Sequence, residues 1–211
     1  MIESALPLLL KAALITIEAS ALGAVFGSVF GVLMGLASCN RLKVPGISQL
    51  IAAYVTIIRG TPMFIQLLFV YFALPEIIGV DIAPLPAGVI ALSINSAAYL
   101  SEIVRGGLNS IPSGQWEACE TLGYSTSQAL IYIILPQALK TVLPAITNEF
   151  STLIKESSIL MVIGVPELVK TSRDIVAREL KPIEIYALTA LIYLIMTSTV
   201  AFFTKKLEQK I

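Results

Sequence analysis

The sequence lacks histidine and contains only two cysteines. Without histidine there is no Ser-His or Cys-His nucleophile, no His-ligated zinc and no His-ligated haem. Cys39 and Cys119 lie far apart with no C-x-x-C spacing, so neither a disulfide scaffold nor a metal knuckle is indicated. We therefore expect no catalytic residues and no metal site in this chain.

Charge is also scarce. Charged residues make up 13% of the 211 residues and hydrophobic residues 56%, with a mean hydropathy of +0.87. Ordinary soluble domains are about 25% charged, so most helical faces here cannot face water. The 14 basic and 14 acidic residues cancel, which argues against nucleic-acid binding, because that affinity depends on clustered Lys and Arg. The composition predicts an all-α membrane protein that contacts the lipid bilayer on several faces.

Five apolar stretches are long enough to cross a bilayer as helices, which needs about 20 residues each. We expect a single transmembrane domain over residues 1–211, without a separate soluble domain. The counts of Lys and Arg in the connecting loops favour an external N-terminus and an internal C-terminus, with Arg41, Lys43 and Lys210 among the internal cations. The predicted spans are 8–38, 48–74, 86–108, 139–164 and 183–204.

The first span carries glycine at every fourth position. A stripe of this kind removes side-chain bulk from one helix face and lets another helix approach closely. The sequence therefore predicts helix packing here, either within the chain or against a second copy. The four residues are Gly23, Gly27, Gly31 and Gly35.

The segment 109–136 between the third and fourth spans contains the start and stop signals of two short helices. Ser113 is expected to cap the first helix, with Glu117 in an early turn and Gly123 in the left-handed conformation after the last turn. Ser125 begins a capping box for the second helix, and Pro136 is expected to end or kink it. From the residues alone, this segment is either a docking lever or an amphipathic element at the membrane surface.

The spacing in this segment resembles a known motif. Glu117-Ala118-Cys119, then Gly123, then Ile133-Ile134-Leu135-Pro136 match the E-A-A-x3-G-x9-I-x-L-P loop of binding-protein-dependent ABC importer permeases, with Cys119 replacing the second alanine. Further stretches between 50 and 170 resemble the polar amino-acid subfamily: 59–62, 71–75, 98–107, 114–118, 158–160 and 164–168.

This resemblance implies a type I ABC importer permease fold with five spans and a cytoplasmic coupling helix that docks onto an ATPase. Two copies of a cytoplasmic ATP-binding subunit, a second permease subunit and an extracellular or periplasmic amino-acid-binding protein are the implied partners. A homodimer is favoured and a heterodimer with a homologous subunit stays open. The implied docking residues are Ser113, Trp116, Glu117, Ala118, Thr121, Leu122, Gly123, Leu135 and Pro136.

The chain itself is expected to bind no ATP and no other cofactor, because it has no G-x-x-x-x-G-K-[ST] phosphate loop. ATP and Mg²⁺ would be bound by the partner subunit. The implied location is the bacterial cytoplasmic membrane, as a multi-pass subunit. The implied activity is import of a basic or polar amino acid, with arginine or lysine favoured.

Ionisable groups at membrane depth mark the expected substrate route, because such groups are costly against lipid. Asn95, Tyr99 and Glu102 share a helix face, and Arg59 precedes a helix break. The alternative is that Arg59, Glu102, Arg105 and Lys155 pair among themselves or contact lipid headgroups. The predicted route comprises Arg59, Thr61, Asn95, Tyr99, Glu102, Glu149 and Ser157.

Two other functional classes stay open from the residues. A secondary carrier or channel would use the intramembrane acids and lysine to relay ions, but it leaves the structured 109–136 loop unexplained. An intramembrane enzyme would need a serine-lysine dyad of Lys155 with Ser157 or Ser158. Copurification with an ATPase separates the transporter from the carrier.

Overall fold

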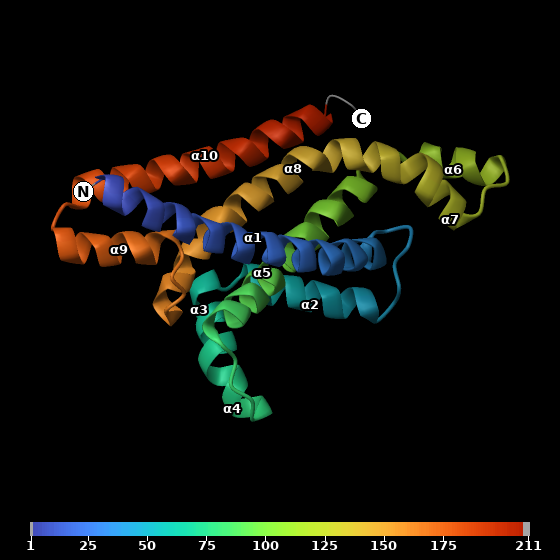
Figure 1. Ribbon diagram of the computed structural model, residues 1–211. Coiled ribbons are helices and arrows are strands. Elements are labelled where there is room, and N and C mark those ends of the chain that lie inside the picture. The colour runs from blue at the N-terminus through green and yellow to red at the C-terminus, as the bar shows by residue number, and fades with distance from the viewer. Residues whose placement is uncertain (1, 209–211) are drawn as a thin grey trace.

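The computed structural model describes residues 2–208, which form helices and connecting turns without strands. The longest helices lie side by side, and a short arm containing α3 and α4 projects from them (Figure 1). The α-helices are α1 (Ile2–Ser38), α2 (Ile47–Arg59), α3 (Met63–Leu68), α4 (Leu74–Ile78), α5 (Pro84–Asn109), α6 (Ser113–Thr121), α7 (Thr126–Ala129), α8 (Leu135–Glu156), α9 (Leu168–Glu179) and α10 (Pro182–Glu208). Two π-helical segments, Phe69–Ala73 and Leu130–Ile134, and one 3₁₀ segment, Ser157–Ile163, join some of them.

Four continuous stretches of helix within residues 2–208 are long and apolar enough to cross a membrane: Ser4–Ser38, Pro84–Asn109, Thr126–Ile163 and Pro182–Leu207. The expected span 48–74 is instead a bent pair, Ile47–Arg59 and Met63–Ile78, with an angle of 104° between its halves. The bend lies at Gly60-Thr61-Pro62, because proline has no N–H to donate and forces the preceding residue out of the helical conformation.

The glycine stripe on α1 packs within the chain, against α5. A Cβ atom added to Gly31 would lie 2.6 Å from the Cβ of Leu100 and 3.0 Å from the carbonyl oxygen of Ala97. The glycines therefore let the two backbones approach more closely than any side chain would allow, which confirms the prediction of helix packing. The facing residues, in order from Gly23 to Gly35, are Leu92, Ser96, Leu100 and Val104.

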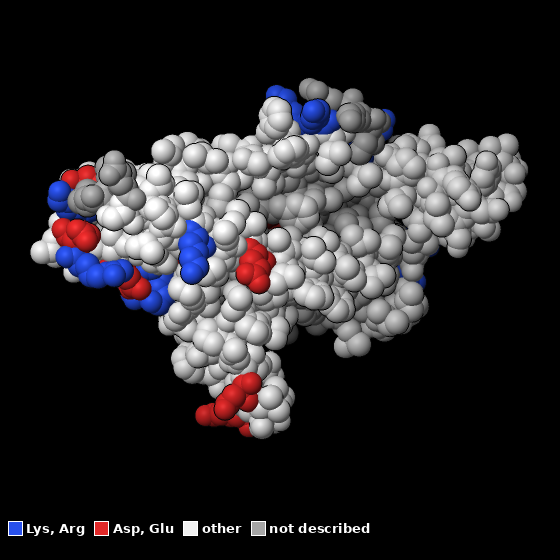
Figure 2. Space-filling model, in the orientation of Figure 1, with Lys and Arg blue, Asp and Glu red and all other residues white. Residues whose placement is uncertain are grey.

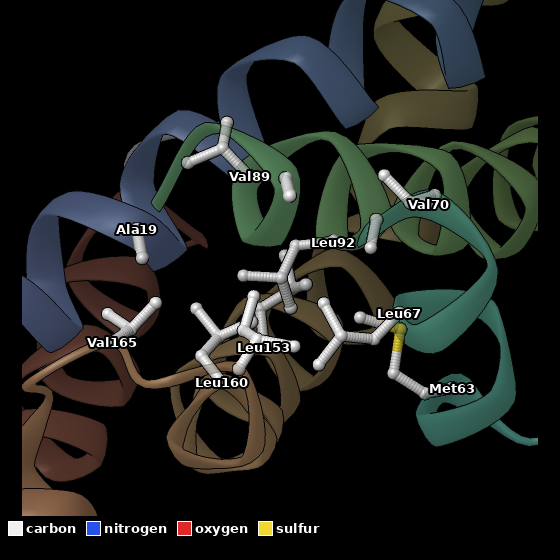
Figure 3. Close-up of a cluster of buried hydrophobic side chains, with 12 residues drawn as sticks. Ala19, Met63, Leu67, Val70, Val89, Leu92, Leu153, Leu160 and Val165 are labelled. Atoms are coloured by element: carbon white, nitrogen blue, oxygen red, sulfur yellow. The ribbon is translucent and has the colours of Figure 1, made fainter. Parts of the chain in front are cut away.

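Buried apolar side chains from five helical segments meet beside the bend. Ala19 of α1, Leu92 of α5 and Leu153 of α8 converge with Leu67 of α3 and Leu160 of the 3₁₀ segment (Figure 3). All five are almost completely buried. This cluster fixes the α2–α3 bend against α5 and α8, so the polar groups at the bend have a defined place.

Pro136 does not end the helix that precedes it, which was one of the two outcomes expected for this residue. The π-helical segment Leu130–Ile134 continues directly into α8, and Pro136 lies in the first turn of α8. A π-helical widening shifts the hydrogen-bond register by one residue, so it accommodates a residue that lacks an N–H. The chain thus forms one helical path from Thr126 to Ile163.

Apart from one basic and one acidic patch on the surface between them, most of the charged residues visible in Figure 2 gather at the ends of the molecule. In the view of Figure 2 they cluster near α9, at the tip of the α4 arm and near the end of α10, and most of the intervening surface is uncharged. Exposed leucine, isoleucine, valine and phenylalanine side chains on α1 and α10 cover that surface. This distribution fits a bundle with a lipid-facing middle. Lys210, one of the cations used to predict the orientation, lies outside the described residues.

Candidate functional site

The segment 109–136 forms the expected pair of helices. α6 spans Ser113–Thr121 and projects with α7 from one end of the bundle (Figure 1). The capping residue is Pro112 rather than Ser113, and Glu117 lies beyond the first turn. Pro112 has extended backbone angles, so the helix already begins at Ser113. The serine hydroxyl is therefore not available as an N-cap.

The C-terminal end of α6 has the predicted glycine turn. Gly123 has a φ of 81°, in the left-handed region that favours glycine. The Gly123 N–H donates to the carbonyl of Glu120 and the Tyr124 N–H donates to the carbonyl of Cys119, each at 3.0 Å. This pair of bonds is a Schellman motif. It fixes the direction in which the chain leaves α6 and enters α7.

The start of α7 is also fixed as expected. The Gln128 N–H donates to Ser125 Oγ at 3.4 Å, and Gln128 Oε1 accepts from the Ser125 N–H at 2.9 Å. This is the predicted capping box. The turn between α6 and α7 is therefore held at both ends by defined hydrogen bonds.

α6 has one anchored face and one free face. Trp116 and Cys119 are buried beside Cys39, the residue that follows α1. On the surface, the Arg41 guanidinium lies 3.7 Å from the carboxylates of both Glu117 and Glu120. The other predicted docking residues are exposed: Ser113, Glu117, Ala118, Thr121, Leu122 at 75%, Gly123, Leu135 and Pro136.

Gln66 holds the bend between α2 and α3. Its Nε2 donates to the carbonyls of Ile58 and Thr61 at 2.7 and 3.0 Å, and its Oε1 accepts from Asn95 Nδ2 of α5 at 3.0 Å. Gln66 thus connects the predicted residues Thr61 and Asn95. Gln66 was not among the residues predicted from the sequence, although a glutamine four residues after Pro62 in an apolar helix was a usable signal.

Arg59, Tyr99 and Glu102 form a second polar cluster, which also includes Arg105. Arg105 donates two hydrogen bonds to Glu102, at 2.8 and 2.7 Å. The Arg59 guanidinium lies 3.7 Å from Glu102 and 5.0 Å from the centre of the Tyr99 ring. Glu102 is therefore shared by two arginines, as the alternative of internal pairing predicted for these three residues.

Glu149 and Ser157 lie on the fourth helical path. Glu149 is 9% exposed. The hydroxyl of Ser96 on α5 is buried and has no hydrogen-bond partner among the described residues. Ser157 is buried and its Oγ donates to the carbonyl of Ile154 at 2.8 Å. The structure therefore groups the predicted route into two α2–α5 clusters and a separate buried acid. Ser96 was not among the residues predicted from the sequence.

The sequence of this chain matches known proteins over nearly its whole length. Residues 27–211 match the model of the family described as binding-protein-dependent transport system inner membrane component. The glutamine transport system permease protein GlnP of Escherichia coli (strain K12) is 39% identical over 98% of this chain and 94% of its own length. The arginine transport system permease protein ArtQ of Bacillus subtilis (strain 168) is 36% identical over 98% of this chain and 93% of its own.

Solved structures agree. The crystal structure of an amino acid ABC transporter with histidines superposes with a TM-score of 0.87 at 35% identity, over 97% of this chain and 94% of that one. An inward-facing methionine ABC transporter, MetNI, superposes at 0.86 and shares 22% identity, over 100% of this chain and 99% of that one; it supports the fold alone. From the matched family model and the relatives' identity over nearly the whole chain, the protein belongs to the family of binding-protein-dependent transport system inner membrane components.

Proposed function

We propose that this chain is the transmembrane subunit of an ABC transporter that imports a basic or polar amino acid across the bacterial cytoplasmic membrane. Relatives that match over almost the whole chain are named for glutamine and arginine transport. The proposed topology has five spans, counting the bent α2–α3 pair as one, with the N-terminus outside and the C-terminus inside. The Arg41, Lys43, Lys205 and Lys206 cations would then lie on the cytoplasmic side.

The exposed α6 helix is the observation that carries this proposal. Its outer face presents Ala118 and Leu122, while Trp116 and Cys119 anchor the opposite face to the bundle. A helix anchored on one side and free on the other suits a groove in a cytoplasmic ATPase. Motion of that ATPase would then reach the bundle through a rigid contact, without any ATP bound by this chain.

The partners follow from the same assignment. Two ATPase copies would dock onto two permease subunits related by a two-fold axis, and a second copy of this chain is the favoured partner. The family implies a binding protein that delivers the amino acid from outside. The chain needs no catalytic residue of its own, in keeping with relatives that are transport permeases rather than enzymes.

The polar clusters support a route for an amino acid. Arg59 retains a partly exposed guanidinium beside its shared carboxylate and would attract the carboxylate of the cargo. Glu102 is occupied by two arginines, so Glu149 is the acid better placed to attract a cationic group. This arrangement favours arginine or lysine as the cargo and also accommodates glutamine.

Purified complex, containing the ATPase and the binding protein, tests this function. A screen of the twenty amino acids should find that a basic or polar one stimulates ATP hydrolysis, and uptake into vesicles should follow the same preference. Glu149→Gln should weaken the preference for a cationic cargo. Glu179→Gln is the matched control, because Glu179 is exposed on α9. Stimulation by none of the amino acids would refute the proposal.

Coupling is tested at Gly123. Gly123→Val forces a β-branched residue into the left-handed region and should reduce transport per ATP hydrolysed. Gly114→Ala is the control, since both glycines have open space around them and only Gly123 has a positive φ. Equal coupling ratios in both variants would contradict the docking role of α6.

A further inference from the structure

A polar crevice opens between α1, α2 and α5 at the end of the molecule that carries α6. Its volume is about 490 Å³. It extends from Asn40 and Lys43, in the connection between α1 and α2, to Arg59 of α2 and Arg105 of α5. Figure 1 shows this connection and the start of α2 on the same side of the bundle as α6 and α7.

The crevice carries an excess of positive charge. Lys43, Arg59 and Arg105 line it, and Glu102 is the single acid among its lining residues. Both arginines already share Glu102, so its one negative charge cannot neutralise them. Lys43 is exposed and forms no salt bridge with any described residue. The crevice thus suits an anion.

Ser48 gives an independent sign of a missing partner. It lies in the lining of the crevice and is 7% exposed, yet its hydroxyl has no hydrogen-bond partner among the described residues. Buried hydroxyls are normally bonded, and an orphaned one points to a group absent from the chain itself. The Ser48 oxygen is closed off from solvent, so a small local shift would let a ligand with several acceptor oxygens satisfy this hydroxyl and the Lys43 ammonium together.

The α2 side of the crevice forms an apolar rim. Ile51 and Val55 line the crevice beside the charged residues, and Leu50 and Ile57 on the outer face of the same helix are 73% and 62% exposed. Exposed apolar side chains beside a cationic pocket match a molecule with a charged head and hydrocarbon tails. An amino acid or a free phosphate would leave this apolar surface uncovered.

We propose that the Lys43 and Ser48 end of the crevice binds the phosphate headgroup of an anionic phospholipid of the cytoplasmic leaflet, with the acyl chains along the exposed face of α2, which leaves Arg59 at the other end free for the cargo. The cytoplasmic leaflet is negatively charged and attracts basic side chains near the membrane surface. This inference rests on the proposed orientation, which places Lys43 and α6 on the same, cytoplasmic side.

Lipid binding to the full chain in its purified complex tests the proposal. The complex in detergent is titrated with phosphatidylglycerol or phosphatidylcholine, and the lipids retained are counted by native mass spectrometry. Wild-type chain should retain phosphatidylglycerol in preference to phosphatidylcholine. Lys43→Gln should weaken phosphatidylglycerol binding roughly fivefold, the effect of one basic residue near an anionic surface.

Two further variants separate a binding role from a structural one. Lys206→Gln removes a cation at the same end of the molecule, on α10 and outside the crevice, and should leave binding unchanged. Ser48→Ala should weaken phosphatidylglycerol binding without lowering the unfolding temperature, because the hydroxyl has no hydrogen-bond partner among the described residues. Equal binding by Lys43→Gln and Lys206→Gln would overturn the site.

A competition arm distinguishes the two sources of phosphate. Excess inorganic phosphate should leave phosphatidylglycerol bound, since the ion has no hydrocarbon tail for the apolar rim. Displacement by inorganic phosphate would show a free-anion site and overturn the lipid assignment. Lipid counting uses neither amino acid nor nucleotide, so a failed transport assay leaves this result unaffected.

The proposed orientation has its own readout. Lys43→Cys should react with an impermeant maleimide only after cells are opened. Labelling in intact cells would place the crevice at the outer leaflet, which overturns the cytoplasmic assignment independently of the lipid count.

Discussion

The contact between α1 and α5 makes a sharp prediction for Gly31→Ala. The added methyl group would lie 2.6 Å from the Cβ of Leu100 and 3.0 Å from the carbonyl oxygen of Ala97. Ordinary contacts begin at about 3.4 Å, so the helices would have to separate by roughly 1 Å. The carbonyl belongs to the backbone, so no rotation of a side chain can relieve it.

The expected cost follows from two opposing effects. Forcing an extra methyl group into a packed interior typically costs about 1–3 kcal/mol. Replacing glycine by alanine inside a helix returns about 0.5–1 kcal/mol. The net loss for Gly31→Ala is therefore at most about 2.5 kcal/mol and about 1 kcal/mol near the middle of both ranges, and the latter value corresponds to a fall of roughly 2–4 °C in the unfolding temperature of a chain of this size.

Gly106→Ala is the matched control. Gly106 lies within α5, is exposed and has no atom within 4 Å of an added Cβ, so only the helix-propensity gain applies. Thermal unfolding of both variants in one detergent should show Gly31→Ala falling and Gly106→Ala unchanged or slightly raised. If both variants shift together, close packing of the α1–α5 seam is not what the glycine stripe provides.

Three other predictions use buried polar and thiol groups. Gln66→Ala removes a donor from the Ile58 carbonyl, which keeps the Thr61 N–H at 3.4 Å, and leaves the Thr61 carbonyl without another partner among the described residues. The loss of that one carbonyl partner should cost about 1–3 kcal/mol, whereas Gln137→Ala loses a single carbonyl contact on a partly exposed helix turn and should cost less in the same unfolding assay. Burial raises the pKa of Glu167 above its ordinary value of 4.5. Because the folded chain then holds its proton more tightly than the unfolded chain, stability should fall as pH rises through that raised pKa, and Glu167→Gln should flatten the pH profile; an unchanged profile would contradict this. Cys39 and Cys119 are 1% and 4% exposed, so a maleimide should label them slowly in the folded chain and promptly after unfolding in SDS.

The turn within the loop 109–136 could be predicted from the sequence because it depends on residues close to each other along the chain. A positive φ at Gly123 and the capping box at Ser125 depend on neighbours a few residues away, and both are present. The predicted capping residue of α6 was wrong because two adjacent residues can each occupy the N-cap position. Pro112 took the capping position in place of the adjacent Ser113, and composition alone does not decide between them.

The glycine stripe was partly predictable for a different reason. Period-four spacing shows that a close helix contact exists, but a stripe on one helix does not say which helix faces it. That choice depends on the register of α5, where Leu92, Ser96 and Leu100 repeat at the same spacing. Tertiary pairing of this kind depends on the packing of the bundle rather than on either helix by itself.

The pairing of Glu102 shows why single polar residues in a span are poor guides to a substrate site. Asn95, Tyr99 and Glu102 do share one helix face, as the spacing requires. Their roles differ because of partners elsewhere: Asn95 bonds to Gln66, while Glu102 is held by Arg105 three residues along the same helix. Helical spacing predicts the face, and only the partners decide whether a group is free for cargo.

The bend at Pro62 connects these observations. A proline within a span leaves helix carbonyls without donors, and in the absence of water each must find another partner. Gln66 supplies a donor to the carbonyls of Ile58 and Thr61, and its own side-chain oxygen accepts a hydrogen bond from Asn95 of α5. Movement of α3 relative to α2 must therefore break bonds to Gln66. If the proposed transport cycle involves such movement, Gln66→Ala should change transport more than it changes binding of the ATPase.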